Sequence, residues 1–120
     1  MSGRFRTTRC YTQTMKTLDT ALLAEVTRRL VDEFHPEQII LFGSHAWGMP
    51  DEESDVDVVV VVPESDLSPH LRAARAYRSL RGLPIPIEVR VRTRAEFDRY
   101  RSVPASLERQ ISEEGKRLYG

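Results

Sequence analysis

The chain has 120 residues, of which 40% are hydrophobic and 30% charged; this balance is typical of a soluble globular domain and excludes a fibrous or intrinsically disordered chain. Its 18 basic and 18 acidic residues cancel, no apolar run reaches the roughly 18 residues of a membrane span, and we expect no direct binding to nucleic acid or membrane. One cysteine, Cys10, cannot form an internal disulfide, which predicts a cytoplasmic protein.

Residues 1–16 carry basic residues and no acid, and we predict a flexible basic N-terminal extension there. Residues 17–120 are enough for one hydrophobic core but not for a separate substrate-binding domain. A large substrate would therefore be bound from another chain, and self-association is left open.

An apolar residue at every fourth position predicts a first helix over residues 18–35, ended by Pro36. Residues 38–42 and 56–62 are mostly apolar and predict two strands, and the unbroken apolar run 39–42 suggests that the first is covered on both faces.

A second helix is predicted over residues 67–83. On a helical wheel, Arg72, Arg75 and Arg78 lie opposite its apolar face, so they are either an exposed surface or a binding surface for an RNA backbone or an acidic partner. A third strand, 85–92, alternates apolar and charged residues and should have one solvent-facing side. Arg90 and Arg92 are on that side, where they would contact a phosphate, offset nearby acids or form a simple surface ladder.

Two further helices are predicted at 94–101 and 104–114, with Pro104 in the first turn of the latter, and a short edge strand at 116–119. Helices and strands in this order predict an α/β (α+β) fold, a small mixed sheet backed by helices.

Two acids begin the 56–62 strand. Asp55 and Asp57 are two residues apart, so both carboxylates project to the same side of a strand. Two close carboxylates repel each other unless a cation lies between them, and hard oxygen ligands suit Mg²⁺. Glu88, on the solvent-facing side of the third strand, would be a third carboxylate if the strands are neighbours.

Gly43 and Ser44 follow the first buried strand. Backbone N–H groups at such a turn, together with a serine hydroxyl, can cradle a phosphate, and glycine lets the phosphate approach the backbone. Either motif alone is more often a plain turn or a solvated strand end.

Together, Gly43-Ser44-x-Ala46-x-Gly48 and Ser54-Asp55-x-Asp57 resemble the signature of the polymerase β-type nucleotidyltransferase superfamily. Residues 17–120 resemble its minimal nucleotidyltransferase (MNT) branch, including a closing Glu114-Gly115-x-x-Leu118-Tyr119.

The resemblance implies a Mg²⁺-dependent enzyme that transfers a nucleoside monophosphate, AMP from ATP, to a hydroxyl. It implies that Gly43 and Ser44 bind the β- and γ-phosphates and that Asp55 and Asp57 bind both the triphosphate and two metal ions. Glu88 would bind the second metal and help to activate the hydroxyl. Members of the MNT branch usually have aspartate at this third position, although glutamate is the base in some aminoglycoside nucleotidyltransferases.

MNT proteins resemble the smaller half of a two-gene pair with HEPN-domain proteins. The resemblance therefore implies an antitoxin that AMPylates a HEPN-domain toxin encoded nearby. The alternative is a binding module that neutralises its partner by contact alone. A third possibility, an antibiotic nucleotidyltransferase, would need an additional helical substrate domain.

Overall fold

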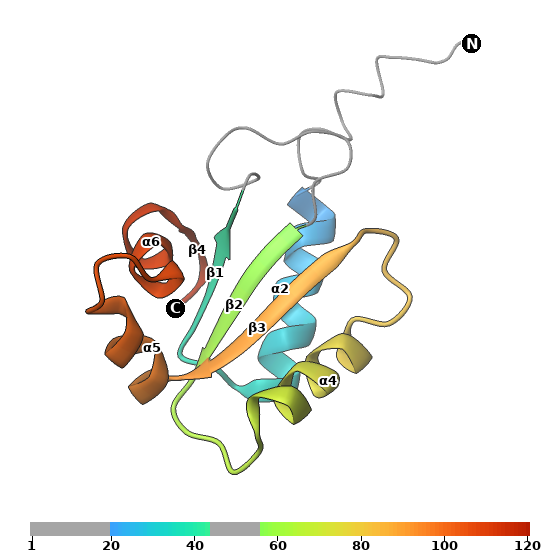
Figure 1. Cartoon of the computed structure of the whole chain (residues 1–120). Coiled ribbons are helices and arrows are strands. Elements are labelled where there is room, and N and C mark those ends of the chain that lie inside the picture. Colours follow the sequence, from blue (N-terminus) through green and yellow to red (C-terminus); the bar gives the residue numbers. More distant parts are fainter. Residues whose placement is uncertain (1–19, 44–55) are drawn as a thin grey trace, which may run out of the picture.

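The computed structural model describes residues 20–43 and 56–120, so the predicted N-terminal extension lies outside the described residues. A four-stranded sheet forms the centre of the molecule, with helices on both sides (Figure 1). The strands are β1 (Gln38–Phe42), β2 (Val56–Val62), β3 (Ile87–Thr93) and β4 (Lys116–Tyr119). The helices are α2 (Thr20–Phe34), α4 (Pro69–Ser79), α5 (Arg94–Arg101) and α6 (Leu107–Glu114). No helix in these two ranges is long and apolar enough to cross a membrane.

The strand order is β3-β2-β1-β4, and the sheet is mixed. β1 is antiparallel to β2 and to β4, whereas β2 and β3 are parallel and are joined by a crossover that contains α4. A parallel pair requires such a long connection, because the chain must return to the end of the sheet at which the first of the two strands began. The predicted fold class, a mixed sheet backed by helices, is confirmed.

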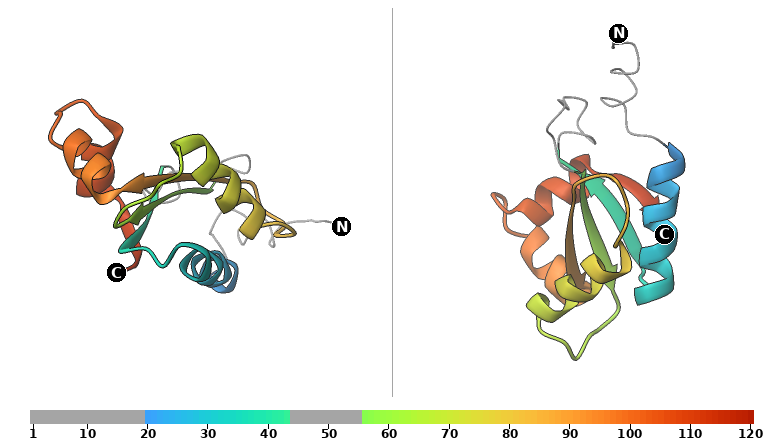
Figure 2. Two further views of the ribbon diagram at one scale, coloured as in Figure 1. Left: turned by 90° about the horizontal axis from the view of Figure 1, so that it is seen from below. Right: turned by 90° about the vertical axis from the view of Figure 1, so that its right-hand side faces the viewer.

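The valine run of β2 supplies both faces of the sheet. Val58 and Val60 pack into a core with α2 and α4, while Val59 and Val61 pack on the other side with Phe97 of α5. Figure 2 shows α5 and α6 on one side of the sheet and α2 on the other. Because side chains alternate along a strand, an unbroken apolar run is what a strand buried on both faces needs.

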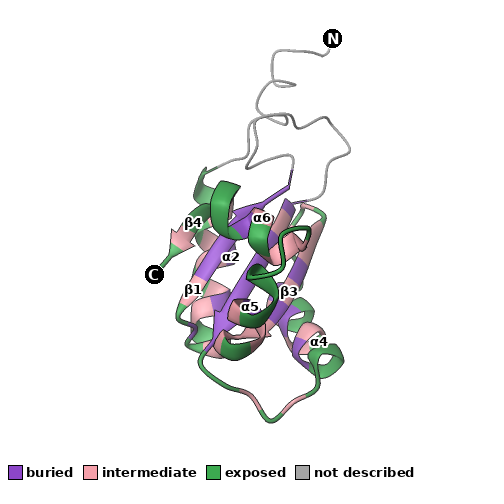
Figure 3. Cartoon of the chain, turned by 60° about the vertical axis from the view of Figure 1, so that its left-hand side comes forward, coloured by how far each residue is buried: buried purple, intermediate pink, exposed green. Residues whose placement is uncertain are grey.

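Helices α5 and α6 cover only part of their side of the sheet. Polar side chains on the uncovered part can be reached by a substrate. The buried residues of that side come from β1, β2, α5 and α6, and none comes from β3. Figure 3 shows the buried strands β1 and β2 behind α5 and α6. On β3, the face that carries Glu88, Arg90 and Arg92 is only partly buried, as its alternating pattern predicted.

Side-chain caps set the helix boundaries. The Ser68 hydroxyl accepts a hydrogen bond from the Leu71 N–H, so α4 begins at Pro69. Ser106 caps α6 in the same way, through the Arg109 N–H. The prediction that Pro104 lies in the first turn of the last helix was therefore wrong, because Pro104 lies in the turn before the capping serine.

The prediction that Arg72 lies on an exposed helix face was also wrong, because its side chain is only 5% exposed. Its guanidinium donates hydrogen bonds to the Glu96 carboxylate, to the Val91 carbonyl and, through Nε, to the Leu67 carbonyl. A buried guanidinium must satisfy its donors, and these three acceptors do so. Arg72 therefore ties α4 to β3 and α5.

Candidate active site

Asp57 and Glu88 lie side by side at one end of the sheet. Each is the second residue of its strand, and the two are paired in the parallel register of β2 and β3. Neighbouring strands are about 4.8 Å apart, and paired residues project from the same face, so both carboxylates point to the α5/α6 side. The Glu88 side chain is 46% exposed, which leaves it accessible to a substrate.

Gly43 lies at the same end of the sheet as Glu88, on the opposite side of Asp57. Phe42, the last residue of β1, pairs with Asp57, so Gly43 comes directly after that pairing. Its φ of +80° is favourable for glycine and strained for other residues. A Cβ atom on Gly43 would collide with Oδ2 of Asp57 and would lie 3.2 Å from its Cγ. The Asp57 carboxylate therefore lies against the bare backbone of Gly43.

Ser44 and Asp55 lie outside the described residues, so their predicted roles stay predictions. The structure brings together the other three predicted site residues, Gly43, Asp57 and Glu88, from three different strand ends.

The donor set of this end of the sheet suits a divalent metal ion. Asp57 and Glu88 offer carboxylate oxygens from adjacent positions, and hard cations such as Mg²⁺ prefer a small number of carboxylates together with phosphate and water. Residues 20–43 and 56–120 contain no group of three or more acidic, histidine or cysteine side chains with metal-binding geometry. The Asp57 and Glu88 carboxylates fit a metal ion that is bound jointly with a phosphate substrate.

Two arginines on β3 differ in their surroundings. Arg92 is 24% exposed and lies with its Nε 3.6 Å from the Glu108 carboxylate of α6. Arg90 instead points its Nη2 at Oε2 of Glu88, at 3.4 Å. The sequence pattern placed both arginines on one face of the strand, but only the tertiary structure pairs Arg92 with Glu108 of α6 and Arg90 with Glu88.

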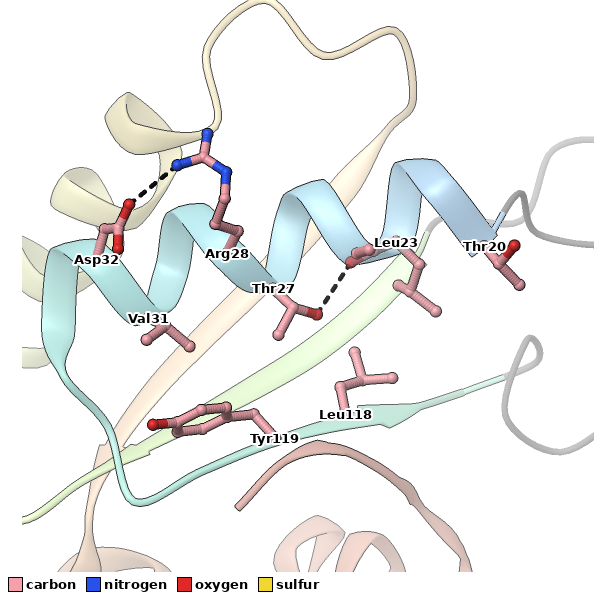
Figure 4. A pocket seen from close by; sticks show the side chains of 9 residues that line it. Thr20, Leu23, Thr27, Arg28, Val31, Asp32, Leu118 and Tyr119 are labelled. Carbon is pink, nitrogen blue, oxygen red and sulfur yellow. Dashed lines mark hydrogen bonds and ion pairs between the residues drawn. The ribbon is translucent and has the colours of Figure 1, made fainter.

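A hollow of about 470 Å³ lies between α2 and β4, away from these carboxylates (Figure 4). It is lined by apolar side chains, including Leu23, Val31 and Leu118. Its charged residues are tied to each other, since Arg28 donates to Asp32 at 3.0 Å. α2 packs on the face of the sheet opposite Asp57, so this groove is separate from the carboxylates.

Comparison with known proteins agrees with this geometry. The model of the nucleotidyltransferase domain family matches residues 23–118. The fold is similar to a crystal structure of a candidate nucleotidyltransferase from Sulfolobus solfataricus, with a TM-score of 0.54 and 26% sequence identity over 66% of this chain and 70% of that chain. No curated protein matches the sequence. The match over most of the chain shows that it belongs to the nucleotidyltransferase domain family.

Proposed function

We propose that this nucleotidyltransferase uses Mg²⁺ and transfers AMP from ATP to a hydroxyl group on a HEPN-domain protein. The partner is a toxin, and the transfer inactivates it, so that the chain acts as an antitoxin. The observation that carries the proposal is the pairing of Asp57 with Glu88, with Gly43 packed against Asp57. This arrangement offers metal-binding carboxylates and a close approach to bare backbone at one point, as a nucleoside triphosphate requires.

In the proposed reaction, the acceptor hydroxyl oxygen forms a bond to the α-phosphorus, the bond between the α- and β-phosphates breaks, and pyrophosphate leaves. Glu88 takes up the hydroxyl proton, for which its half-exposed carboxylate is accessible. Asp55, Asp57 and Glu88 would hold the Mg²⁺ through which the triphosphate is bound in line with the acceptor, and Gly43 and Ser44 bind its β- and γ-phosphates. Bound Mg²⁺ would supply charge neutralisation of the phosphates and would lower the pKa of the hydroxyl.

The acceptor is proposed to come from another protein because of the position of Glu88. β3 is an end strand of the described sheet, and its polar face is not covered by the apolar residues of α5 and α6. A side chain of a partner can therefore approach Glu88 from the β3 side.

The alternative is a binding module that neutralises the partner by forming a complex. The contact between Glu88 and Arg90 favours it, because the guanidinium occupies a carboxylate oxygen that catalysis would need. This alternative predicts a stable complex without nucleotide transfer.

The test is incubation of the chain with ATP labelled at the α-phosphate, Mg²⁺ and the HEPN-domain protein, followed by mass analysis of any labelled band. We expect label on the partner, and loss of at least about 99% of it with Asp57→Asn or Glu88→Gln. The matched control is Asp66→Asn, which removes an exposed acid beyond the opposite end of β2. A complex that forms without any label would instead support the binding module.

A further inference from the structure

We propose that Arg90 is a phosphate-binding residue of this active site, which exchanges its contact with Glu88 for two oxygens of the nucleotide's triphosphate. The proposal rests on the proposed function and adds a residue to it. Arg90 is two positions along β3 from Glu88 and on the same face, and its guanidinium is already in contact with the Glu88 carboxylate.

The hydrogen bonds of Arg90 are incomplete in a specific way. Nε and Nη2 form one edge of the guanidinium, and this edge fits two oxygens of one phosphate. Nη2 has an acceptor in Oε2 of Glu88, but at 3.4 Å, close to the limit for a hydrogen bond. Nε is buried and has no hydrogen-bond partner among the described residues. One edge of Arg90 thus makes a single long bond where two short ones are possible.

An unpaired buried donor costs free energy, because it has lost its water without gaining an acceptor. Arg90 Nε is the only such side-chain atom found in the described parts of the chain, residues 20–43 and 56–120. Unpaired polar groups of this kind are uncommon and often belong to a functional site whose ligand is missing. An anionic ligand that supplies two oxygens to this edge would remove the cost.

The surroundings of Arg90 favour a phosphate over another protein group. Its neighbour across the sheet is Val59, which is buried and offers no acceptor. Arg92, the next charged residue on this face of β3, is already next to Glu108. The Arg90 side chain as a whole is 38% exposed although Nε itself is buried, so a ligand that enters beside Glu88 reaches Nε when the guanidinium turns away from Glu88.

The exchange follows from charge. When Asp57 and Glu88 hold a divalent cation, the Glu88 carboxylate is neutralised and attracts Arg90 less strongly. The same event brings the negatively charged triphosphate to this end of the sheet. The guanidinium then has a better acceptor next to it than the one it leaves.

The experiment measures binding rather than turnover. α,β-methylene-ATP, which cannot transfer its nucleoside monophosphate, is titrated with Mg²⁺ into the full chain by calorimetry. The variants are Arg90→Gln, Arg90→Lys, Glu88→Gln and the double variant Glu88→Gln/Arg90→Gln. Arg78→Gln, an exposed arginine of α4 on the other side of the sheet, controls for the loss of one positive charge.

We expect Arg90→Gln to raise the Kd at least about tenfold, and the increase to persist in the Glu88→Gln background, while Arg78→Gln leaves the Kd unchanged. Arg90→Lys should lie between, because it keeps the charge and loses the planar fork. It also keeps the test valid if the glutamine variant does not fold.

Two results would overturn the proposal while leaving the proposed function intact. One is an unchanged Kd in Arg90→Gln, and the other is an effect that disappears in the Glu88→Gln background, which would make Arg90 only a positioning residue for Glu88. If the unmodified chain does not bind the analogue at all, the proposed function fails, and the role of Arg90 fails with it.

Discussion

Asp57 and Glu88 are direct partners in the parallel register of β2 and β3, although they are far apart in the sequence. Two carboxylates in this arrangement repel each other, and the repulsion is relieved when a cation binds between them. Metal binding and stability are therefore coupled at this end of the sheet.

Mg²⁺ should raise the melting temperature of the unmodified chain, because a ligand that binds only the folded state stabilises it. With Asp57→Asn or Glu88→Gln, the increase should be much smaller, since each variant removes one of the two described carboxylates. Differential scanning fluorimetry with increasing Mg²⁺, and with EDTA as reference, measures this. Asp66→Asn is the control and should respond like the unmodified chain, and a full Mg²⁺ response in both site variants would contradict the metal site.

Gly43→Ala should destabilise the chain by roughly 2–3 kcal/mol, because alanine is strained at positive φ and its methyl group would collide with the Asp57 carboxylate. Gly82 is a matched control: its φ is +92°, but nothing lies within 4 Å of an added Cβ. Gly82→Ala should cost only the backbone strain, about 1 kcal/mol. Urea unfolding measures both variants, and equal costs would show that the Asp57 contact is not tight.

The Arg72–Glu96 ion pair predicts a loss of stability in acid. The Arg72 guanidinium lowers the pKa of the Glu96 carboxyl to about 2, through its hydrogen bonds and against the effect of burial. Because the folded-state pKa is below the unfolded one, the stabilisation is complete above pH 5 and is lost as the pH falls from about 4.5 toward 2. Arg72 is almost fully buried and Glu96 is 26% exposed, so this pair is worth on the order of 2–3 kcal/mol.

Glu96→Gln should therefore reduce the free energy of unfolding at pH 7 and make less difference at pH 3, as measured by denaturant unfolding at both values. The control is Glu25→Gln. The pKa of Glu25 is also lowered to about 2 by Arg28 and Arg29, but Arg28 is 59% exposed whereas Arg72 is buried, so water screens the Glu25 pair more strongly. A pH-independent effect of Glu96→Gln would contradict the ion-pair explanation.

Phe97→Ala should cost about 3–5 kcal/mol, because Phe97 is 1% exposed and fills the core between α5 and the sheet. Tyr100→Ala, on the same helix but 45% exposed, should cost less than about 1 kcal/mol. Thermal and urea unfolding distinguish the two. A small effect of Phe97→Ala would mean that α5 is not anchored through this ring.

The sequence determined the elements because local patterns carry them. The strands at 38–42 and 56–62 and the helix at 94–101 have the predicted bounds, since apolar periodicity and breaking residues are local signals. The sequence predicted that Glu88 lies near Asp57 only if their two strands are neighbours in the sheet. Gly43 was identified from the Gly-Ser motif that follows the first strand. The start of the last helix differs from the prediction, because the Ser106 side chain caps it by accepting a hydrogen bond from the Arg109 N–H. The helix therefore begins after Pro104, at Leu107.

Tertiary structure alone decided which residues meet. A helical wheel places Arg72 on the polar side of its helix. It contains no information about Glu96, which lies in another helix and accepts the hydrogen bonds that allow Arg72 to be buried. The alternation of β3 places Arg90 and Arg92 on one face, but only the packing of α6 takes Arg92 and leaves Arg90 beside Glu88. Periodicity fixes the direction of a side chain relative to its own backbone, whereas a contact depends on the register and packing of two segments, which neither segment encodes alone.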